Sequence, residues 1–189
     1  MANPILDKLK GGSLISDGRA DDVADEVLQR PDRFPKLKAG LSASDDVVRG
    51  RAAHALEKVV HIHPQWLSVH LGQIMRQVVD DPLPMTRWHL VMLLTDLAED
   101  GNHDQIIDVL LTCLQDDSAF VLSWAISGLC MLGRRHPQRA AEILQALRPL
   151  RNVSGTAIRA RAAKAVERLE NPLLPIPEGW AKIMESTLS

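Results

Sequence analysis

The sequence of 189 residues has few aromatic residues and few cysteines. Only 3% of the residues are aromatic, tyrosine is absent, and the two cysteines are Cys113 and Cys130. Because large aromatic side chains are scarce, alanine and leucine have to fill the core, which favours packing of helix against helix. Both cysteines lie in apolar stretches, so we expect two buried free thiols and no disulfide.

The sequence also has no motif that carries catalysis or binds a metal. It contains no Gly-x-Ser-x-Gly, no glycine loop for phosphates and no cysteine set beside a candidate base. Of the seven histidines, only His54, His61, His63 and His70 cluster, and a metal needs three or four converging ligands. We therefore predict a protein that is not an enzyme and that has no metal site and no cofactor.

Neither a membrane span nor a secretory signal is apparent in the sequence. The longest apolar run, residues 119–133, contains serine and glycine and is too short to cross a bilayer. The first residues lack a basic stretch followed by an apolar run. The formal net charge of −2 implies no strong global field. From these absences we expect a cytoplasmic protein that does not bind membranes.

What the sequence does contain is one phrase of nine residues that occurs four times. Val-Arg-Gly-Arg-Ala-Ala-His-Ala-Leu begins at Val48, and related phrases begin at Met85, Val121 and Ile158. The spacings are 37, 36 and 37 residues. A period of this size is typical of a solenoid, in which pairs of helices stack on one another.

Each phrase begins the first helix of a pair, here called the A helix, and a B helix follows after a turn. We expect the first B helix to bury four apolar residues at helical spacing: Leu67, Leu71, Ile74 and Val78. The turn tripeptide His-Pro-Gln occurs at residues 63–65 and again at 136–138, which is 73 residues later. This spacing equals two repeats, so it supports the register independently of the phrase.

The pattern predicts a single all-α domain over residues 1–189, a right-handed superhelix of about four helix pairs. Residues 1–44 form an N-terminal cap and a degenerate first pair, and residues 45–170 form the regular repeats. Residues 171–189 form a C-terminal cap, in which a last helix runs from about Glu178 to Leu188. Such covers are needed because a terminal repeat has no neighbour to hide its core face.

The repeated phrase resembles the A helix of short HEAT-like repeats. The pairs Asp45-Asp46, Asp80-Asp81 and Asp116-Asp117 stand where that family often has an acidic boundary, and the resemblance covers roughly residues 45–169. It implies an α-solenoid whose B helices line a concave face. Eight polar residues of the B helices and their turns are then candidates for contact with a partner: Gln65, Arg76, Asp104, Asp108, Thr112, Gln138, Gln145 and Arg148.

Charge is segregated along the chain. Residues 80–117 contain nine acidic residues and one basic residue, whereas residues 118–189 contain ten basic and five acidic residues. Two interpretations are open. Either neighbouring repeats carry complementary charges, each pair of which is worth little at the surface, or a binding surface has an acidic centre between basic flanks.

The fourth position of the phrase carries a second set of candidates. It is occupied in turn by Arg51, Trp88, Trp124 and Arg161. These side chains either pack laterally between adjacent A helices, or Trp88 and Trp124 form an aromatic patch that cations flank and that anchors a partner.

The intact repeats and the missing catalytic motifs predict a scaffold or adaptor that binds a protein partner on its concave face. Two alternatives stay open. One is nucleic-acid binding, by resemblance in architecture to HEAT-like alkylpurine DNA glycosylases, although no catalytic residue of that family can be matched here. The other is help with cofactor attachment, as in HEAT-like pigment lyases.

The C-terminal arginines would bind phosphates only from a shared face, and helical spacing separates Arg159 from Arg161. The oligomeric state is left open.

Overall fold

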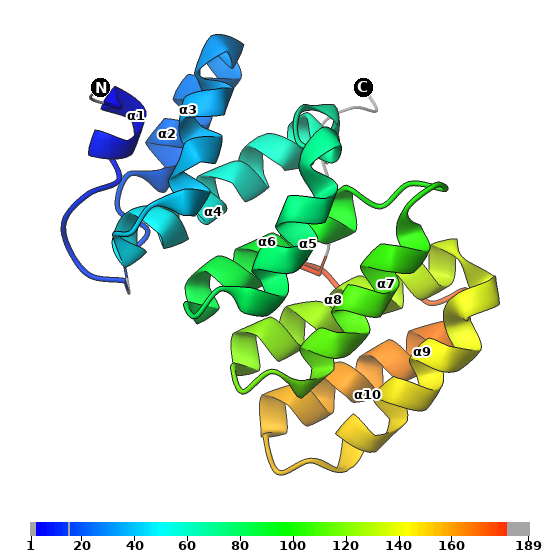
Figure 1. Ribbon diagram of the computed structural model, residues 1–189. Coiled ribbons are helices and arrows are strands. Elements are labelled where there is room, and N and C mark those ends of the chain that lie inside the picture. The colour runs from blue at the N-terminus through cyan, green and yellow to red at the C-terminus, as the bar shows by residue number, and fades with distance from the viewer. Residues whose placement is uncertain (1–2, 15, 181–189) are drawn as a thin grey trace. The chain divides into compact units, whose positions relative to one another are not determined.

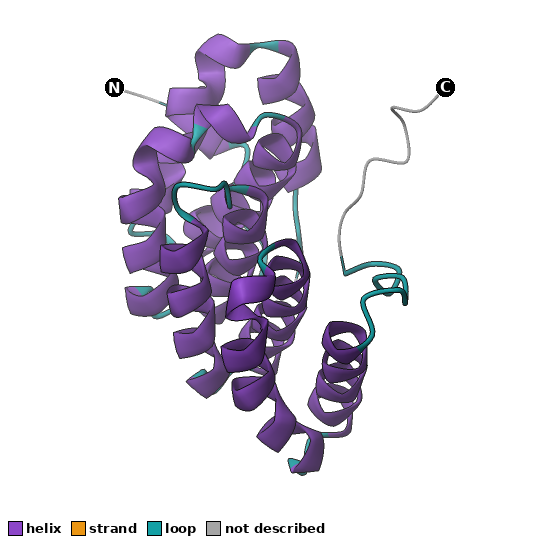
Figure 2. Cartoon of the chain, turned by 90° about the vertical axis from the view of Figure 1, so that its right-hand side faces the viewer, coloured by secondary structure: helices purple, strands orange, loops and turns teal. Residues whose placement is uncertain are grey.

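A computed structural model describes residues 3–14 and 16–180 (Figure 1). The chain divides into two compact units, Met1–Glu99 and Asp100–Ser189. The first unit contains α1 (Pro4–Asp7), α2 (Ala20–Gln29), α3 (Phe34–Lys38), α4 (Asp46–Ile62), α5 (Leu71–Asp80) and α6 (Pro84–Asp96). The second contains α7 (His103–Thr112), α8 (Ala119–Arg135), α9 (Ala140–Leu147) and α10 (Thr156–Glu170). In the described residues these helices are joined by loops and short 3-10 turns, and no strand is present (Figure 2).

The acidic boundaries of the repeats act as local backbone caps. The Asp45 carboxylate accepts hydrogen bonds from the Val47 and Val48 amides at 2.9 and 3.2 Å, which satisfies two free donors at the start of α4. Asp81 and Asp116 likewise accept from the amide two residues ahead, at 2.9 and 2.7 Å. One aspartate of each predicted pair therefore organises the backbone where the next A helix begins.

In the first unit, the A helices α4 and α6 pack against each other, and α2 packs against α4. The apolar stripe of α4 is buried as the periodicity predicts, with Ala52, Leu56 and Val59 fully inaccessible. The predicted B-helix stripe is only partly right, because Leu71 is half-buried. Two 3-10 turns, Pro64–Trp66 and Ser68–His70, precede the α-helix, which begins only at Leu71. The buried Leu67 lies between these two turns and so outside the helix.

In the second unit, α8 packs against α10, and both contact α9. The cysteine prediction is confirmed, because Cys113 and Cys130 are free and buried. The Cys130 thiol lies 3.7 Å from the Ala165 carbonyl oxygen, and burial raises its pKa to about 11. The chain leaves the helix after Glu170 as predicted. Residues 178–180 form a turn, and the rest of the predicted last helix lies outside the described residues.

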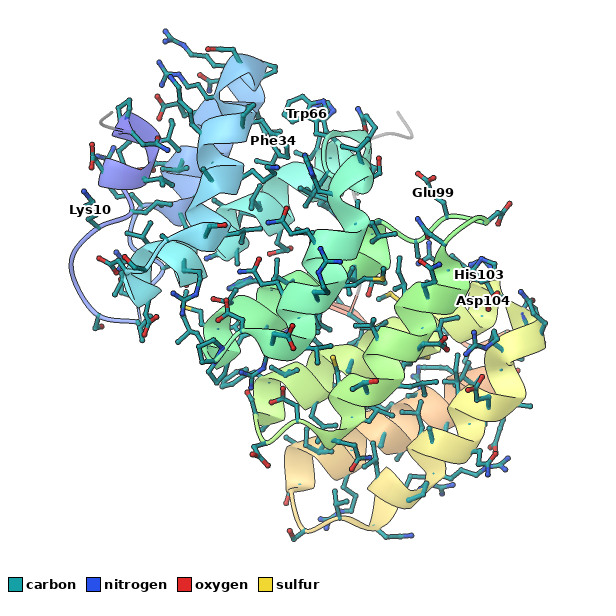
Figure 3. The ribbon with its side chains drawn as sticks, in the orientation of Figure 1. Lys10, Phe34, Trp66, Glu99, His103 and Asp104 are labelled. Carbon is teal, nitrogen blue, oxygen red and sulfur yellow. The ribbon has the colours of Figure 1, made fainter. Side chains whose placement is uncertain are left out.

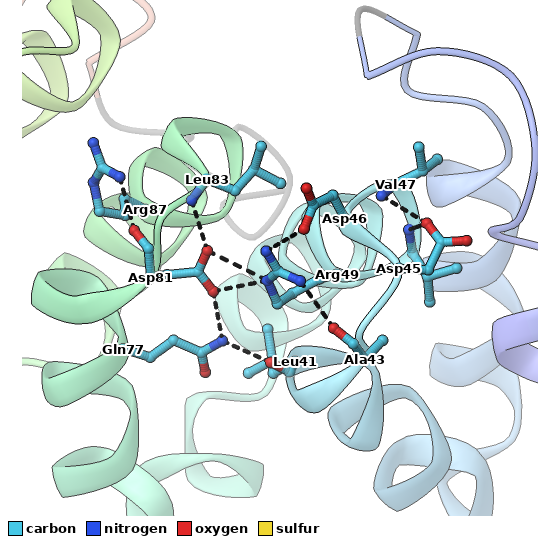
Figure 4. Close-up of polar contacts among 11 residues, drawn as sticks. Leu41, Ala43, Asp45, Asp46, Val47, Arg49, Gln77, Asp81, Leu83 and Arg87 are labelled. Atoms are coloured by element: carbon cyan, nitrogen blue, oxygen red, sulfur yellow. Dashed lines mark hydrogen bonds and ion pairs between the residues drawn. The ribbon is translucent and has the colours of Figure 1, made fainter.

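A buried ion pair connects the A helix α4 to the next repeat boundary (Figure 4). The Arg49 Nε donates to both carboxylate oxygens of Asp81, at 3.3 and 3.0 Å, and the two side chains are 10% and 4% exposed. The other guanidinium nitrogens donate to the Ala43 carbonyl at 2.9 Å and to Asp46 at 2.5 Å. Gln77 completes the network, with its amide donating to Asp81 at 3.1 Å. Since both charges are paired and hydrogen-bonded, their desolvation is compensated.

Arg51, the first member of the candidate set at the fourth phrase position, binds the backbone of the segment between α1 and α2, which we call the N-terminal segment. It is 3% exposed, and its guanidinium donates to the carbonyl oxygens of Leu9, Gly11, Ser13 and Ser16 at 2.6–3.2 Å. Gly18 approaches the same group so closely that a Cβ there would lie 2.5 Å from the guanidinium carbon. Its φ of +57° also favours glycine.

A pair of stacked imidazoles lies between α4 and α6. The rings of His54 and His89 are 4.4 Å apart and nearly parallel, and both residues are buried. Burial and the neighbouring His89 lower the pKa of His54 to about 4. Asp17, Glu57 and Lys58 are the other charged groups that act on it, and the two carboxylates only partly oppose this shift. Nδ1 of each ring has no hydrogen-bond partner among the described residues.

We predict that Arg51→Lys loosens the N-terminal segment. A lysine has three donors on one nitrogen and cannot reach four carbonyl oxygens arranged around a planar guanidinium. The free energy of unfolding should fall by about 2 kcal/mol, and amides in residues 9–13 should exchange faster with deuterium. The matched control is Arg76→Lys on the exposed side of α5. Equal exchange in both variants would contradict the assignment.

We predict that His54 makes stability depend on pH between about 6.5 and 4. Its folded pKa is lowered to about 4, so the unfolded chain binds the proton more tightly in this window and stability falls as pH falls. The loss from this group reaches about 3 kcal/mol at the acid end. Denaturant titrations of His54→Gln should show a flatter pH profile than the parent. Gln73→Ala, which changes an exposed and uncharged residue of α5, serves as the control and should keep the parental slope.

Candidate functional site

The eight residues predicted to contact a partner are all exposed. Gln65 and Arg76 belong to the first unit. The other six lie in the second unit, on the outer side of α7 and α9 and of the turns that flank α9, which we call the α7–α9 face: Asp104, Asp108, Thr112, Gln138, Gln145 and Arg148. The structure therefore brings six of the eight candidates onto neighbouring elements of one compact unit.

One arginine organises the acidic part of the α7–α9 face. Arg139 Nη1 donates to Asp104 at 2.7 Å, its Nη2 to Asp108 at 2.6 Å, and its Nε to Glu142 at 2.8 Å. Asp104 projects from the first turn of α7, next to His103 (Figure 3). Arg139 itself precedes α9, so it joins one B helix to the next. Sequence reasoning included both aspartates but missed the arginine that connects them.

These contacts bear on the two interpretations of the segregated charge. The hydrogen bond from Arg139 holds the pKa of Asp104 below its usual range, and Asp108, Asp104 and Glu142 together raise the pKa of Arg139. The three carboxylates are 53–66% exposed, so each pair is strongly screened by solvent. Complementary charge between neighbouring B helices, the first interpretation above, is thus realised here. Three carboxylates around one guanidinium still leave the cluster negative.

The recurring His-Pro-Gln turns build aromatic stacks beside their B helices. His136 stacks on His103 with 3.8 Å between ring centroids, and burial followed by the neighbouring His103 lowers the pKa of His136. Gln138 lies 3.3 Å from the His103 ring nitrogen. In the first unit, His63 stacks in the same way on Trp66 at 4.3 Å, and Trp66 meets the edge of Phe34 at 5.5 Å (Figure 3). These contacts anchor the turns that precede the predicted contact residues.

A shallow open depression follows the charged cluster along the α7–α9 face. Its volume is about 450 Å³, and it runs between the end of α7 with the turn Cys113–Gln115 and α9 with the turn Arg148–Asn152. Apolar side chains and polar side chains both line it: Leu111, Leu114, Ala146, Pro149 and Leu150, with Gln115, Glu142 and Gln145. The predicted residue Gln145 is therefore at the edge of a surface depression, where it can reach a bound chain.

The remaining candidates have their own local partners. The Thr112 hydroxyl donates to the Asp108 carbonyl at 3.1 Å, and Arg148 pairs with Glu170 at 2.9 Å. In the first unit, the Gln65 amide lies 3.4 Å from the His63 ring nitrogen. Arg76 is exposed on α5, near Gly72.

The two tryptophans of the repeated phrase have different surroundings. Trp88 is half-buried in the first unit and lies 5.4 Å from the His89 ring. Trp124 is half-buried in the second unit, and the Arg161 guanidinium lies over its ring at 5.3 Å. The Arg161 guanidinium also lies 5.3 Å from the centroid of the Trp180 ring. The contact of Trp124 with Arg161 of α10 is lateral packing between adjacent A helices. The contact of Trp88 with His89 lies within α6, and a shared aromatic patch stays a prediction.

Most of the C-terminal arginines are already engaged within the second unit. Arg134 and Arg168 donate to backbone carbonyl oxygens after α10, whereas Arg139 and Arg148 bind carboxylates. Arg161 lies close to two indole rings and is partly buried, which lowers its pKa. The guanidinium groups therefore do not form one free basic surface of the kind that phosphate binding requires.

Two features are absent from residues 3–14 and 16–180, the part of the chain that the structure describes. No group of three or more histidine, cysteine, aspartate or glutamate side chains is arranged to hold a metal ion in this part of the chain. None of the helices in the same range is both long and apolar enough to span a bilayer.

Comparisons with known proteins support the repeat architecture. A designed armadillo repeat protein, YIII(Dq)4CqI, superposes with a TM-score of 0.59 over 88% of this chain and 81% of its own, at 16% sequence identity. At this identity the likeness concerns the fold alone, and it confirms the predicted helical repeat solenoid. Residues 71–154, less than half of the chain, match the family described as "Required for nuclear transport of RNA pol II C-terminus 1". None of the curated proteins matches the sequence.

We predict that Arg139→Met raises the pKa of Asp104 towards its ordinary value. The variant removes the guanidinium hydrogen bond that stabilises the charged carboxylate. Carboxyl carbon shifts measured by NMR across a pH titration would report the change. Arg148→Met, which removes a pair with Glu170 instead, is the matched control and should leave the Asp104 titration where it is in the parent. An unchanged titration in Arg139→Met would disprove the role of Arg139.

Proposed function

We propose that this protein is a non-catalytic scaffold that binds a protein partner through the α7–α9 face. The observation that carries the proposal is the juxtaposition of a preorganised charged cluster around Arg139 with a partly apolar depression along the same two helices. A partner segment can pair with the polar end and bury an apolar side chain at the other end. Interfaces generally combine such an apolar anchor with a polar rim.

The proposal fits what the comparisons support at a coarse level. Repeat solenoids work as extended surfaces, because each repeat adds a similar pair of helices to the same face. The match to the family described by its requirement in nuclear transport of RNA polymerase II covers α5 to the turn after α9, which includes the whole α7–α9 face. We infer that partner binding in transport is the kind of role this surface serves.

Cluster rigidity is the physical basis of binding in this proposal. Arg139 is only 17% exposed and is held by three carboxylates, so its side chain loses little freedom when a partner arrives. The carboxylate oxygens remain mostly exposed and can accept further hydrogen bonds. Preorganisation of this type reduces the entropy cost of association. In a partner segment with a basic residue next to an apolar one, the basic residue can pair with the carboxylates and the apolar residue can enter the depression.

Site-specific crosslinking tests the proposal. We predict that a photoreactive benzoylphenylalanine at Gln145 captures a discrete protein from native lysate, because Gln145 borders the depression. The matched control carries the same group at Ala160, an exposed position of α10 outside that depression. Nuclease treatment should leave the Gln145 adduct unchanged. In a variant that also carries Ala146→Trp, which fills the depression, the adduct should decrease about tenfold.

Other outcomes of this experiment would contradict the proposal. Adducts of equal identity and yield from Gln145 and Ala160 would mean that capture is unspecific. Adducts that disappear with nuclease would move the function to nucleic-acid binding. A Gln145 adduct that Ala146→Trp does not reduce would mean that the depression takes no part.

A further inference from the structure

The segment after α10, residues 171–180, is called the C-terminal segment here, and it is held by several contacts to α8 and α10. Turns at residues 172–174 and 178–180 flank a short stretch without regular structure. The segment begins at a turn in which the Leu174 amide donates to the Asn171 carbonyl at 3.1 Å, and it ends in a turn at Trp180. Figure 1 shows it at the red end of the colour scale, running behind α8. Prolines at three of its positions remove amide donors and fix the backbone φ angle: Pro172, Pro175 and Pro177.

Two arginines recognise the backbone of the C-terminal segment. Arg134 of α8 donates to the Pro172 carbonyl at 2.6 Å and to the Leu174 carbonyl at 2.7 Å. Arg168 of α10 donates to the Pro175 carbonyl at 3.1 Å. These contacts involve main-chain oxygens and no side chain of the segment. They therefore recognise a backbone with free carbonyl groups and tolerate many sequences.

One aromatic side chain anchors the end of the C-terminal segment. Trp180 is 6% exposed, and the Arg161 guanidinium carbon lies 5.3 Å from the ring centroids of both Trp180 and Trp124. Arg161 is fixed by donation to the Ser127 hydroxyl at 2.6 Å. A cation close to two aromatic rings gives a strong preference for an aromatic ligand at this point. By contrast, Leu173 is 94% exposed and contributes no anchoring contact.

We propose that the surface of α8 and α10 formed by Arg134, Arg168, Arg161 and Trp124 is a second peptide-binding site. Its ligand is a proline-rich segment of a protein partner that carries an aromatic residue about five positions after a proline. The C-terminal segment occupies this site in cis, with Pro175 and Trp180 at that spacing. The site uses the A helices, so it is independent of the α7–α9 face and of the function proposed for that face.

The cis segment sets the condition for binding in trans. A tethered ligand has an effective concentration in the millimolar range, so a partner segment competes only when it binds more tightly or when the cis contacts are weakened. Weakening the cis anchor should therefore expose the site. An added peptide with the same sequence should then bind to the full chain.

A fluorescein-labelled decapeptide with the sequence of residues 171–180 is the probe, and fluorescence anisotropy is the readout. We predict that full-length Trp180→Ala binds the probe at least about tenfold more tightly than the parent, because it has lost the aromatic anchor of the competing segment. Adding Arg134→Ala to that variant should reduce probe affinity about tenfold. A probe in which tryptophan is replaced by alanine should bind equally weakly to all forms of the chain.

Two controls keep the test decisive. Leu173→Ala changes an exposed residue of the same segment and should bind the probe no better than the parent. Pro172→Gly with Pro175→Gly loosens the segment without touching the anchor, so it should also increase probe affinity, and it replaces Trp180→Ala if that variant fails to fold. Equal affinity of the parent and both loosened variants, or affinity that survives Arg134→Ala, would overturn the proposal.

Discussion

The ion pair between Arg49 and Asp81 is the interaction on which the order of the first unit depends. Its two charges lie where an A helix meets the boundary of the next repeat, and nearly all of their surface is removed from water. A charge in that position is costly unless its partner is present, so the pair fixes the register of α4 against the following boundary. Gln77 and Asp46 satisfy the remaining donors and acceptors.

The same chemistry recurs in simpler form along the chain. Arg49, Arg87 and Arg159 each donate to the carbonyl oxygen six residues earlier, at 2.9, 2.8 and 3.4 Å. Arg51 donates hydrogen bonds to backbone carbonyl oxygens of the N-terminal segment, and Arg134 donates to those of the C-terminal segment. Guanidinium groups suit this task because they present several donors in one plane. Much of the basic charge among the described residues therefore serves cohesion within each unit.

The repeat period, the boundaries and the buried thiols could be predicted from the sequence, because they depend on local spacing. The solvent exposure of residues such as Asp104 and Gln145 could be predicted as well, since helical periodicity separates outer positions from buried ones. The partners across helices could not be predicted in this way. That Arg139 binds three carboxylates, or that His54 stacks on His89, depends on the stagger between packed helices, which the period alone does not determine. Trp180 was assigned to a cap, but its stacking on Arg161 required the fold of the C-terminal segment.

Arginines couple one repeat to the next through buried contacts, which is the central claim about this fold. A double-mutant cycle of Arg49→Met and Asp81→Asn, measured by denaturant unfolding of the full chain, tests this claim. The account predicts that each single variant lowers the free energy of unfolding by about 3 kcal/mol. The double variant should then recover enough to give a coupling energy of about 2 kcal/mol. Additive effects, with a coupling energy near zero, would contradict it.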